Sequence, residues 1–138
     1  SLLIGEEDFI RQARRFRKVM GGGMRQAGYL AAAGIYALDH HVERLQEDNA
    51  RARQLGAKLK TLPYVENVRP VRTNIVIFDV KKPFTADSFL AKLKEKEVVA
   101  SAFGPQTIRL VTHLDFTEAM LEVTLDVLEK MAQTVAMK

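Results

Sequence analysis

The stretch Thr73–Lys81, with the sequence TNIVIFDVK, decides the fold of this chain. Its centre is rich in β-branched and aromatic side chains, which favour extended backbone, so it is predicted to be the best strand in the sequence. Asn74, at its start, is expected to satisfy backbone hydrogen-bonding groups. Two shorter strands are predicted downstream at residues 98–103 and 107–113, because the turn residues Gly-Pro-Gln join two further extended patterns.

Helical patterns alternate with these strands. Residues 84–97 form an amphipathic pattern that predicts a helix, with Thr85 as its N-cap. Asp115 and Glu118 have the spacing of a capping box at the start of a closing helix. The resulting order, strand–helix–strand–strand–helix, predicts an α+β fold. The residues expected to line the closing helix are Leu121, Leu125, Leu128, Ala132 and Val135.

The first half of the chain carries strong helical signals. Acidic residues open and basic residues close an apolar stripe within residues 6–20, and Gly21 follows as a natural C′ residue, so a helix is predicted there. A second helical pattern covers residues 27–62, either as two helices that meet near His40 or as one long bent helix. Residues 1–5, SLLIG, have the pattern of a buried strand with no turn before it.

Composition excludes several classes of protein. The 138 residues are 47% hydrophobic, which suffices for one core, and no run of about 18 apolar residues could span a membrane. The start lacks the features of a secretory signal. Without cysteine there is no disulfide, zinc–thiolate site or thiol nucleophile, and a cytoplasmic location is expected. The net charge of +4 raises the question of whether the protein binds nucleic acid. Basic residues alternate with acidic residues along the helices, however, which favours a mixed-charge surface.

Three consecutive glycines, Gly21–Gly23, lie between Lys18 and Arg25 in the run KVMGGGMRQAG. The run matches neither the P-loop nor the dinucleotide-binding fingerprint. One interpretation is a helix C-cap followed by a loop. The other is a tight turn before a helix that starts near Met24, whose free N–H groups would face an anion such as phosphate together with the Arg25 side chain.

Arg109 is the second candidate for function. A surface arginine is the simpler interpretation, but the absence of other polar residues in the run IRLV argues for a buried, paired one, and a guanidinium suits bidentate recognition of a carboxylate. The histidines do not predict a metal site, because His40 and His41 point about 100° apart on a helix and His113 is distant in sequence. The serines lack a nucleophile-elbow context, so nothing supports hydrolase chemistry.

Four runs together resemble the C-terminal part of L-threonine aldolases, which are pyridoxal phosphate (PLP) enzymes of the aspartate-aminotransferase-like fold, fold type I. These runs are SLLIG, RRFRKVMGGGMRQAGYLAAAGIYALDHHVERLQEDN, TNIVIFDV and IRLVTHLDFT. The resemblance covers essentially the whole chain. It implies a C-terminal small domain, with a long connecting helix and a small, mostly antiparallel sheet covered by helices. It also implies a fragment, since the family's Schiff-base lysine lies upstream of the SLLIG-like strand.

Residue by residue, the resemblance makes Arg109 the arginine that binds the substrate α-carboxylate. It matches Lys18 and Arg25 to basic positions near the cofactor phosphate, in the active site of a neighbouring subunit, with Gly21–Gly23 as the hinge of that segment. The implied division of the chain is residues 1–25 as the end of the large PLP-binding domain with the glycine-rich loop, 26–62 as the connecting helix or helix pair, and 63–138 as the small α+β domain.

The implied activity is PLP-dependent cleavage of L-threonine or L-allo-threonine to glycine and acetaldehyde, with the cofactor as the electron sink. None of the ten lysines stands in the family's Schiff-base context, so the chain alone is expected to be inactive. A homo-oligomer acting on a small amino acid is expected, without nucleic-acid, membrane or metal partners. The alternatives are a related PLP-dependent lyase or aldolase for another β-hydroxy amino acid, such as phenylserine, and a non-catalytic basic binding module.

Overall fold

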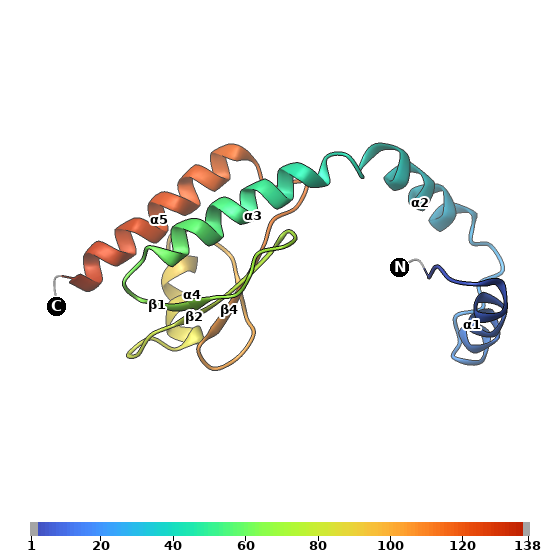
Figure 1. Cartoon of the computed structure of the whole chain (residues 1–138), viewed down its shortest axis with the longest axis horizontal. Coiled ribbons are helices and arrows are strands. Elements are labelled where there is room, and N and C mark those ends of the chain that lie inside the picture. The colour runs from blue at the N-terminus through green and yellow to red at the C-terminus, as the bar shows by residue number, and fades with distance from the viewer. Residues whose placement is uncertain (1–2, 137–138) are drawn as a thin grey trace. The chain divides into compact units, whose positions relative to one another are not determined.

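A computed structural model describes the backbone of residues 3–136 and the side chains of residues 3–133. This part of the chain forms two compact units, which divide between Val42 and Glu43. It contains five helices and four strands (Figure 1), so the predicted α+β class is confirmed. None of the helices within it is both long and apolar enough to cross a membrane. The elements are α1 Glu7–Val19, α2 Gly28–His40, α3 Leu45–Lys60, β1 Val65–Val68, β2 Ile75–Val80, α4 Ala86–Lys94, β3 Ser101–Ala102, β4 Thr107–Val111 and α5 Glu118–Ala136.

The second unit is built on a four-stranded antiparallel sheet with the strand order β1-β2-β4-β3. The stretch TNIVIFDVK forms β2, as predicted, and pairs with β1 on one side and β4 on the other. The strand predicted at residues 98–103 is reduced to Ser101–Ala102. The cause is the preceding helix: the Val98 N–H donates to the Leu93 carbonyl and closes the end of α4, so Val98 is not available to the sheet.

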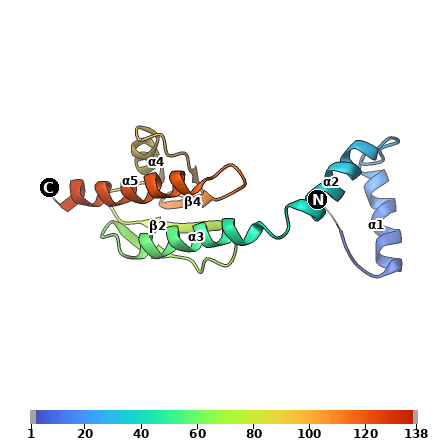
Figure 2. The same ribbon diagram turned by 90° about the horizontal axis from the view of Figure 1, so that it is seen from above.

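One face of this sheet is covered by helices. Val76, Phe78 and Val80 alternate along β2 and are each 0% exposed, because they point at α3, α4 and α5. Phe89 of α4 packs edge-to-face on Phe78, with 5.9 Å between the ring centroids. Figures 1 and 2 show α3 and α5 side by side along the sheet. The remaining large side chains of this core are Leu55, Leu59, Leu93, Ile108, Leu121 and Leu128.

The opposite side of the sheet, called the open face from here on, carries the alternate residues of the same strands. No described helix of the second unit packs on it, and its side chains are half-buried or exposed rather than buried. Because neighbours along a strand point to opposite faces, the residues that build the core and those that meet solvent alternate one by one. The cross-strand pairs of β2 and β4 on this face are Ile75 with Val111, Ile77 with Arg109, and Asp79 with Thr107.

The two predicted helix caps have different outcomes. Thr85 caps α4, since its hydroxyl accepts the Ser88 N–H at 3.2 Å and the Ser88 hydroxyl accepts the Thr85 N–H at 2.9 Å. The capping box predicted at Asp115 is wrong, because the Thr117 hydroxyl accepts the Met120 N–H at 3.3 Å in that role. Of the predicted stripe along α5, Leu121, Leu128 and Ala132 are buried, Leu125 is partly buried, and the side chain of Val135 lies outside those described.

The first unit contains α1, the glycine-rich loop and α2. α1 confirms the predicted helix and ends in a Schellman motif, in which the Gly22 N–H donates to the Arg17 carbonyl at 2.7 Å and the Gly21 N–H to the Lys18 carbonyl at 3.2 Å. Gly21 has a φ of +83°, a left-handed conformation that glycine adopts without a Cβ penalty. The glycine was therefore correctly identified as the residue that ends this helix.

Two other expectations for the first half have opposite outcomes. α2 ends at His40 and α3 begins at Leu45, so the long helical pattern forms two helices rather than one. The strand predicted over SLLIG is wrong for Leu3–Gly5, which form no strand, while Ser1 and Leu2 lie outside the described residues. Extended backbone needs a partner for its N–H and C=O groups, and no described segment pairs with Leu3–Gly5.

Candidate functional site

Arg109 lies at the centre of the open face, opposite Ile77 on one side and Ser101 on the other. Its Nε is buried and has no hydrogen-bond partner among the described residues. Its Cζ lies 5.7 Å from the centroid of the Phe103 ring, which places the guanidinium over an aromatic face. A half-buried arginine whose donors are not all satisfied is a ready binding group for an anion, above all for a carboxylate.

The cross-strand pair next to Arg109 contains a carboxylate that already accepts a hydrogen bond. Asp79 lies opposite Thr107, and the Thr107 Oγ1 donates to the Asp79 Oδ1 at 2.6 Å. On the other side of Thr107, the Phe103 N–H donates to its carbonyl at 2.8 Å. Directly opposite residues of antiparallel strands share a face. A cation, a hydrogen-bonded carboxylate and an aromatic ring therefore lie together on the open face.

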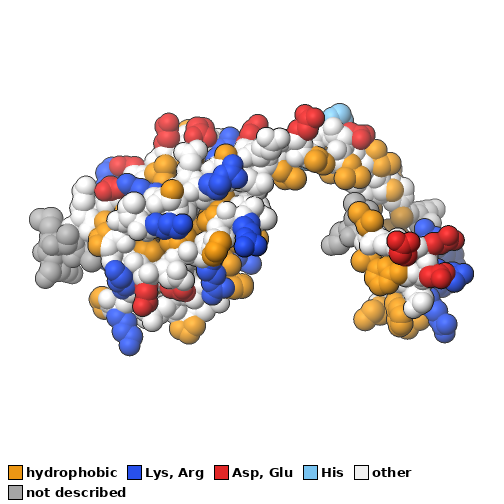
Figure 3. Space-filling view, viewed as in Figure 1, with side chains coloured by type: hydrophobic (Ala, Val, Ile, Leu, Met, Phe, Trp, Pro, Cys, Tyr) orange, Lys and Arg blue, Asp and Glu red, His pale blue; other side chains and the backbone are white. Residues whose placement is uncertain are grey.

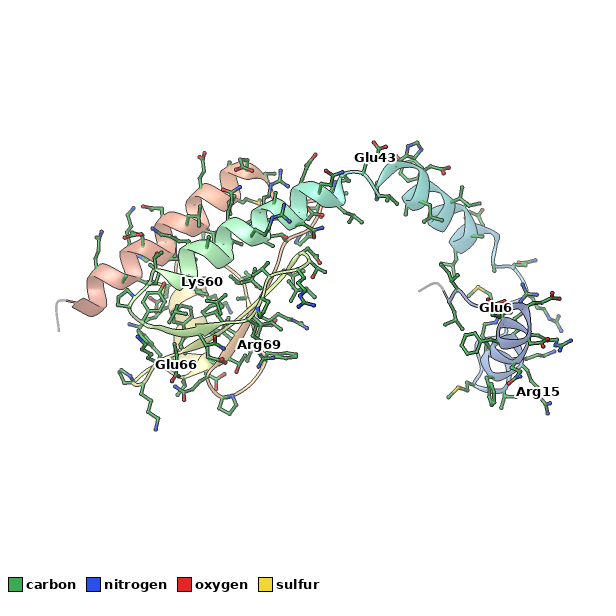
Figure 4. The ribbon with its side chains drawn as sticks, viewed as in Figure 1. Glu6, Arg15, Glu43, Lys60, Glu66 and Arg69 are labelled. Carbon is green, nitrogen blue, oxygen red and sulfur yellow. The ribbon has the colours of Figure 1, made fainter. Side chains whose placement is uncertain are left out.

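A second arginine, Arg69, continues the row of Arg109. Its backbone N–H donates to the Ile77 carbonyl at 2.9 Å, and Arg109 pairs with Ile77 from the other side, so Arg69 lies on the far side of Ile77 from Arg109. Figure 4 labels Arg69 on this unit. Since strands lie about 4.8 Å apart, the two arginine backbones are about 10 Å apart across this row. Figure 3 shows lysine and arginine side chains spread over this unit with hydrophobic side chains between them. On the open face itself, Arg69 and Arg109 lie beside the apolar side chains of Ile75 and Val111, which are 40% and 43% exposed.

The other two candidate cations lie in a different part of the chain. Lys18 and Arg25 belong to the first unit, whereas Arg109 belongs to the second. Both side chains are exposed, Lys18 in the last turn of α1 and Arg25 in the segment before α2. The helix expected near Met24 is wrong, because α2 begins only at Gly28. The glycine run instead supplies the C-cap of α1, which is the first of the two interpretations considered for it.

The histidines lie in unremarkable surroundings. His40 and His41 pack around the Tyr36 ring, with ring-centroid distances of 4.3 Å and 5.6 Å. His113 is exposed, and its Nδ1 lies 3.8 Å from the Asp115 carboxylate. Within the described residues no three His, Cys, Asp or Glu side chains gather in a way that could hold a metal ion.

Four neighbours of Arg109 were not predicted as part of a site: Arg69, Asp79, Phe103 and Thr107. A partial signal was present, because alternation along a strand puts Thr107 on the same face as Arg109. Asp79 and Arg69 reach this face through the pairing of β1, β2 and β4, and that register depends on contacts between distant segments. The two arginines and the carboxylate lie in separate segments of the sequence, and no sequence motif links those segments.

Comparison with known sequences gives a consistent set of relatives. Residues 1–83 match the profile of the beta-eliminating lyase family. The chain is 41% identical over 121 residues to the low specificity L-threonine aldolase of Escherichia coli (strain K12), covering 88% of this chain and 35% of that protein. It is 35% identical over 133 residues to the probable low-specificity L-threonine aldolase 2 of Arabidopsis thaliana, covering 94% of this chain and 38% of that protein. The chain spans about a third of the length of these relatives.

Solved structures share the fold. An adenosylmethionine-8-amino-7-oxononanoate aminotransferase from Methanocaldococcus jannaschii matches 76% of this chain and 26% of its own, with a TM-score of 0.60 and 24% identity. The cystine C-S lyase C-DES matches 74% of this chain and 28% of its own, with a TM-score of 0.59 and 24% identity. These likenesses confirm the predicted fold, that of the C-terminal part of a fold-type-I PLP enzyme.

Proposed function

This chain belongs to the beta-eliminating lyase family, and on that premise we propose that it forms the C-terminal third of a PLP-dependent L-threonine aldolase. The proposed reaction is cleavage of L-threonine or L-allo-threonine to glycine and acetaldehyde. Its support is the identity of 30–41% with low-specificity L-threonine aldolases over most of the chain. The observation that carries it within the molecule is Arg109, half-buried on the open face with an unsatisfied Nε.

In this proposal Arg109 binds the α-carboxylate of the amino-acid substrate. Its planar fork of N–H donors matches a carboxylate, and a bound carboxylate would supply the acceptor that the Nε now lacks. The β4 backbone and the ring of Phe103 restrict where the guanidinium can lie. A fixed carboxylate orients the bond between Cα and Cβ of the substrate, so Arg109 acts by orientation rather than by proton transfer.

PLP is the cofactor of the proposed enzyme, and this chain fits part of its environment. When bound, the cofactor supplies the electron sink for the bond that breaks. Lys18 and Arg25 are exposed cations on either side of the glycine run, and no ion pair to either is formed by the side chains of residues 3–133, so both are available to a phosphate group. We assign them to the phosphate region of a neighbouring subunit, and the lysine that carries the cofactor to the part of the enzyme upstream of this chain.

The proposed division of the chain follows from these assignments. Residues 1–25 end the large domain, residues 26–62 connect the domains, and residues 63–138 form the small domain, with Gly21–Gly23 as the hinge of the basic segment. The connecting segment is anchored at its far end, because α3 packs on β1 and β2 and on α5. A cytoplasmic location fits the absence of cysteine from the sequence.

Replacing Arg109 in the full-length enzyme tests the proposal. R109Q is expected to raise the KM for L-threonine about tenfold to a hundredfold, the range for losing hydrogen bonds to a charged group. R109K, which keeps the charge but lacks the planar fork, is expected to give an intermediate KM. The matched control is R53Q, an exposed arginine of α3 on the covered side of the sheet, with a KM close to that of the parent. An unchanged KM in R109Q would contradict the proposal.

The 138-residue chain by itself is expected to have no aldolase activity. Added PLP, followed by borohydride reduction, should not label any one lysine stoichiometrically. Mass spectrometry of the reduced protein measures this directly. Full labelling of a single lysine, together with cleavage of L-threonine, would show that the chemistry resides in these residues and would contradict the assignment of the cofactor lysine upstream.

A substrate with a different β-substituent is the second candidate, and it is supported by the low specificity stated in the names of the relatives. The full-length enzyme is expected to cleave L-threonine and L-allo-threonine in preference to phenylserine. Comparison of kcat/KM for the three amino acids checks this. A clear preference for phenylserine would favour the second candidate.

The proposed enzyme is a homo-oligomer. Apolar side chains of the first unit support this, because Phe16 of α1 is 63% exposed and Ile35 of α2 is 60% exposed, and apolar surface of this kind is normally covered in an assembly. Figure 3 shows hydrophobic side chains over both helices. Light scattering of the isolated chain is expected to give at least twice the monomer mass. A clean monomer would argue against an interface at these helices.

A further inference from the structure

The open face poses a question of charge pairing. Asp79 lies opposite Thr107, and Arg109 is two residues from Thr107 along β4, so Asp79 and Arg109 are diagonal neighbours. Diagonal neighbours in an antiparallel sheet have backbones about 7–8 Å apart, a separation that an arginine side chain can bridge. Opposite charges at that spacing attract each other and ordinarily form an ion pair. No such ion pair joins Asp79 to Arg109 among the described side chains.

Thr107, rather than Arg109, forms the hydrogen bond to the Asp79 carboxylate. Its Oγ1 donates to the Asp79 Oδ1 at 2.6 Å, a short bond of the charge-assisted kind. The Thr107 side chain has little freedom to leave this position, because it is β-branched and its backbone is fixed at both ends: its N–H donates to the Gly104 carbonyl at 3.3 Å and its C=O accepts the Phe103 N–H at 2.8 Å.

Phe103 acts on the arginine from the other side. It lies across β4 from Asp79, and its ring sits 5.7 Å from the Arg109 Cζ, so the cation–π attraction draws the guanidinium away from the carboxylate. The turn that follows Phe103 is held firmly to the rest of the unit. The Gln106 side-chain amide donates to the Val80 carbonyl at 2.9 Å, and the Ala86 N–H donates to the Pro105 carbonyl at 2.8 Å.

We propose that Thr107 and Phe103 are positioning residues that keep Arg109 apart from Asp79, so that the guanidinium stays available to the carboxylate of an amino-acid substrate. This inference rests on the proposed role of Arg109. It explains the hydrogen bond from Thr107 to Asp79. Without that bond, the Asp79 carboxylate would compete with the substrate carboxylate for Arg109. The substrate then binds to an arginine that has no carboxylate partner to displace among the described side chains.

The test uses the full-length enzyme with PLP bound. T107V keeps the shape of the side chain but removes the hydroxyl, which releases Asp79. Arg69 lies on the other diagonal of Asp79 and competes with Arg109 for the released carboxylate. The expected rise in KM for L-threonine is therefore modest, about fivefold, which is the upper end for a partly exposed ion pair. The value of kcat should change less than KM. T107S, which keeps the hydroxyl, should retain the parent KM.

A second substitution distinguishes competition from damage to the fold. In T107V/D79N the released side chain carries no charge, so the KM should return to the parent value. Inhibition by glycine, which has a carboxylate, should weaken in T107V by the same factor as the KM for L-threonine, whereas inhibition by ethanolamine, which has none, should stay constant. F103A should raise the KM and F103Y, which retains the ring, should not.

The outcomes separate this inference from the function on which it rests. If R109Q leaves the KM unchanged, the carboxylate role of Arg109 fails, and this inference fails with it. If R109Q raises the KM but T107V does not, the role of Arg109 stands and the positioning role of Thr107 is overturned. A raised KM in T107V that D79N does not lower, or a parallel loss of ethanolamine binding, overturns it as well.

Discussion

The helices of the first unit are as regular as those of the second, but their apolar side chains meet solvent. Phe16 of α1 and Ile35 of α2 are 63% and 60% exposed, whereas Leu55 and Leu59 of α3 are 2% and 0% exposed. No described side chain in residues 3–42 is buried, while the second unit encloses a continuous core. The local signals for a helix, such as dipole-matched charges and a glycine C-cap, are therefore independent of whether the helix finds something to pack on.

This difference separates a domain from a segment that needs a partner. α1 and α2 have 13 residues each, and isolated helices shorter than about 12–15 residues are marginal in water. α3 has the same kind of sequence, but the sheet and α5 cover its apolar side. The first unit thus buries none of its described side chains within itself and depends on further protein surface, whereas the second unit has the contacts to stand by itself.

The strongest way to break this comparison is to truncate one large aromatic residue in each unit. Phe89→Ala removes a fully buried ring from the core and is expected to lower the free energy of unfolding by about 3–5 kcal/mol. In the 138-residue chain, diluted until it is monomeric, Phe16→Ala, the matched change in α1, should leave it within about 0.5 kcal/mol, because this side chain is exposed within the single chain. Urea denaturation followed by circular dichroism measures both. Equal losses would mean that α1 contributes to the same core.

A pair of ion pairs gives the second test. Asp48 is 2% exposed and accepts two hydrogen bonds from Arg44, at 2.8 Å and 3.0 Å. Asp48→Ala removes the carboxylate that Arg44 and Arg51 share at the start of α3, so the midpoint of urea unfolding is expected to fall clearly. Asp8 pairs with Arg11 at 2.6 Å in α1, but both side chains are more than three-quarters exposed.

Asp8→Ala is the control for that substitution and should give the parent unfolding curve, because exposed ion pairs contribute little. The Asp48 pair is buried and bidentate, whereas the Asp8 pair is exposed and has one hydrogen bond, so the contrast measures burial and geometry together. A measurable loss in Asp8→Ala, or none in Asp48→Ala, would contradict the interpretation.

The smallest expected effects concern the ends of two helices. Gly21 ends α1 at a φ of +83°, while Glu97, just after α4, adopts a φ of +61° although it carries a side chain. Glu97→Gly is expected to raise the midpoint of thermal unfolding, by the equivalent of about 1 kcal/mol, because it removes a steric penalty of about 1–2 kcal/mol and loses some backbone entropy.

Gly21→Ala is the complementary change and introduces that penalty into the first unit. Since this unit adds no described core, the midpoint should stay the same while the helical signal at 222 nm falls slightly as α1 frays. A shift of the midpoint in Gly21→Ala would indicate that the two units unfold together, and an unshifted midpoint in Glu97→Gly would contradict the strain argument.

The elements that sequence predicted well are those with local causes. β2, the Thr85 cap of α4 and the Gly21 end of α1 each follow from residues within a few positions of one another. The errors have non-local or competing causes: Leu3–Gly5 lack a strand partner, and Thr117 caps α5 in place of Asp115. The N–H of Val98 bonds to the end of α4 instead of pairing in the strand predicted there.

The candidate site follows the same rule. Arg109 was singled out by its apolar neighbours in sequence, and the register of β2 and β4 then added Asp79 across the sheet, 30 residues away. Cross-strand register is fixed by burial of one face and by the whole sheet, which no single stretch reports. The roles of Lys18, Arg25 and Arg109 come from resemblance, and they remain proposals for the experiments above.

The alternation of covered and open residues along β2 and β4 has a consequence for how this domain can change. Val76, Phe78 and Ile108 maintain the core, whereas the side chains between them lie outside it and contact one another and solvent. A combinatorial library at the open-face positions could be screened for new acid specificities while thermal stability is left nearly untouched. Evolution has the same opportunity, because recognition and folding are encoded by interleaved but separate sets of residues on the same strands.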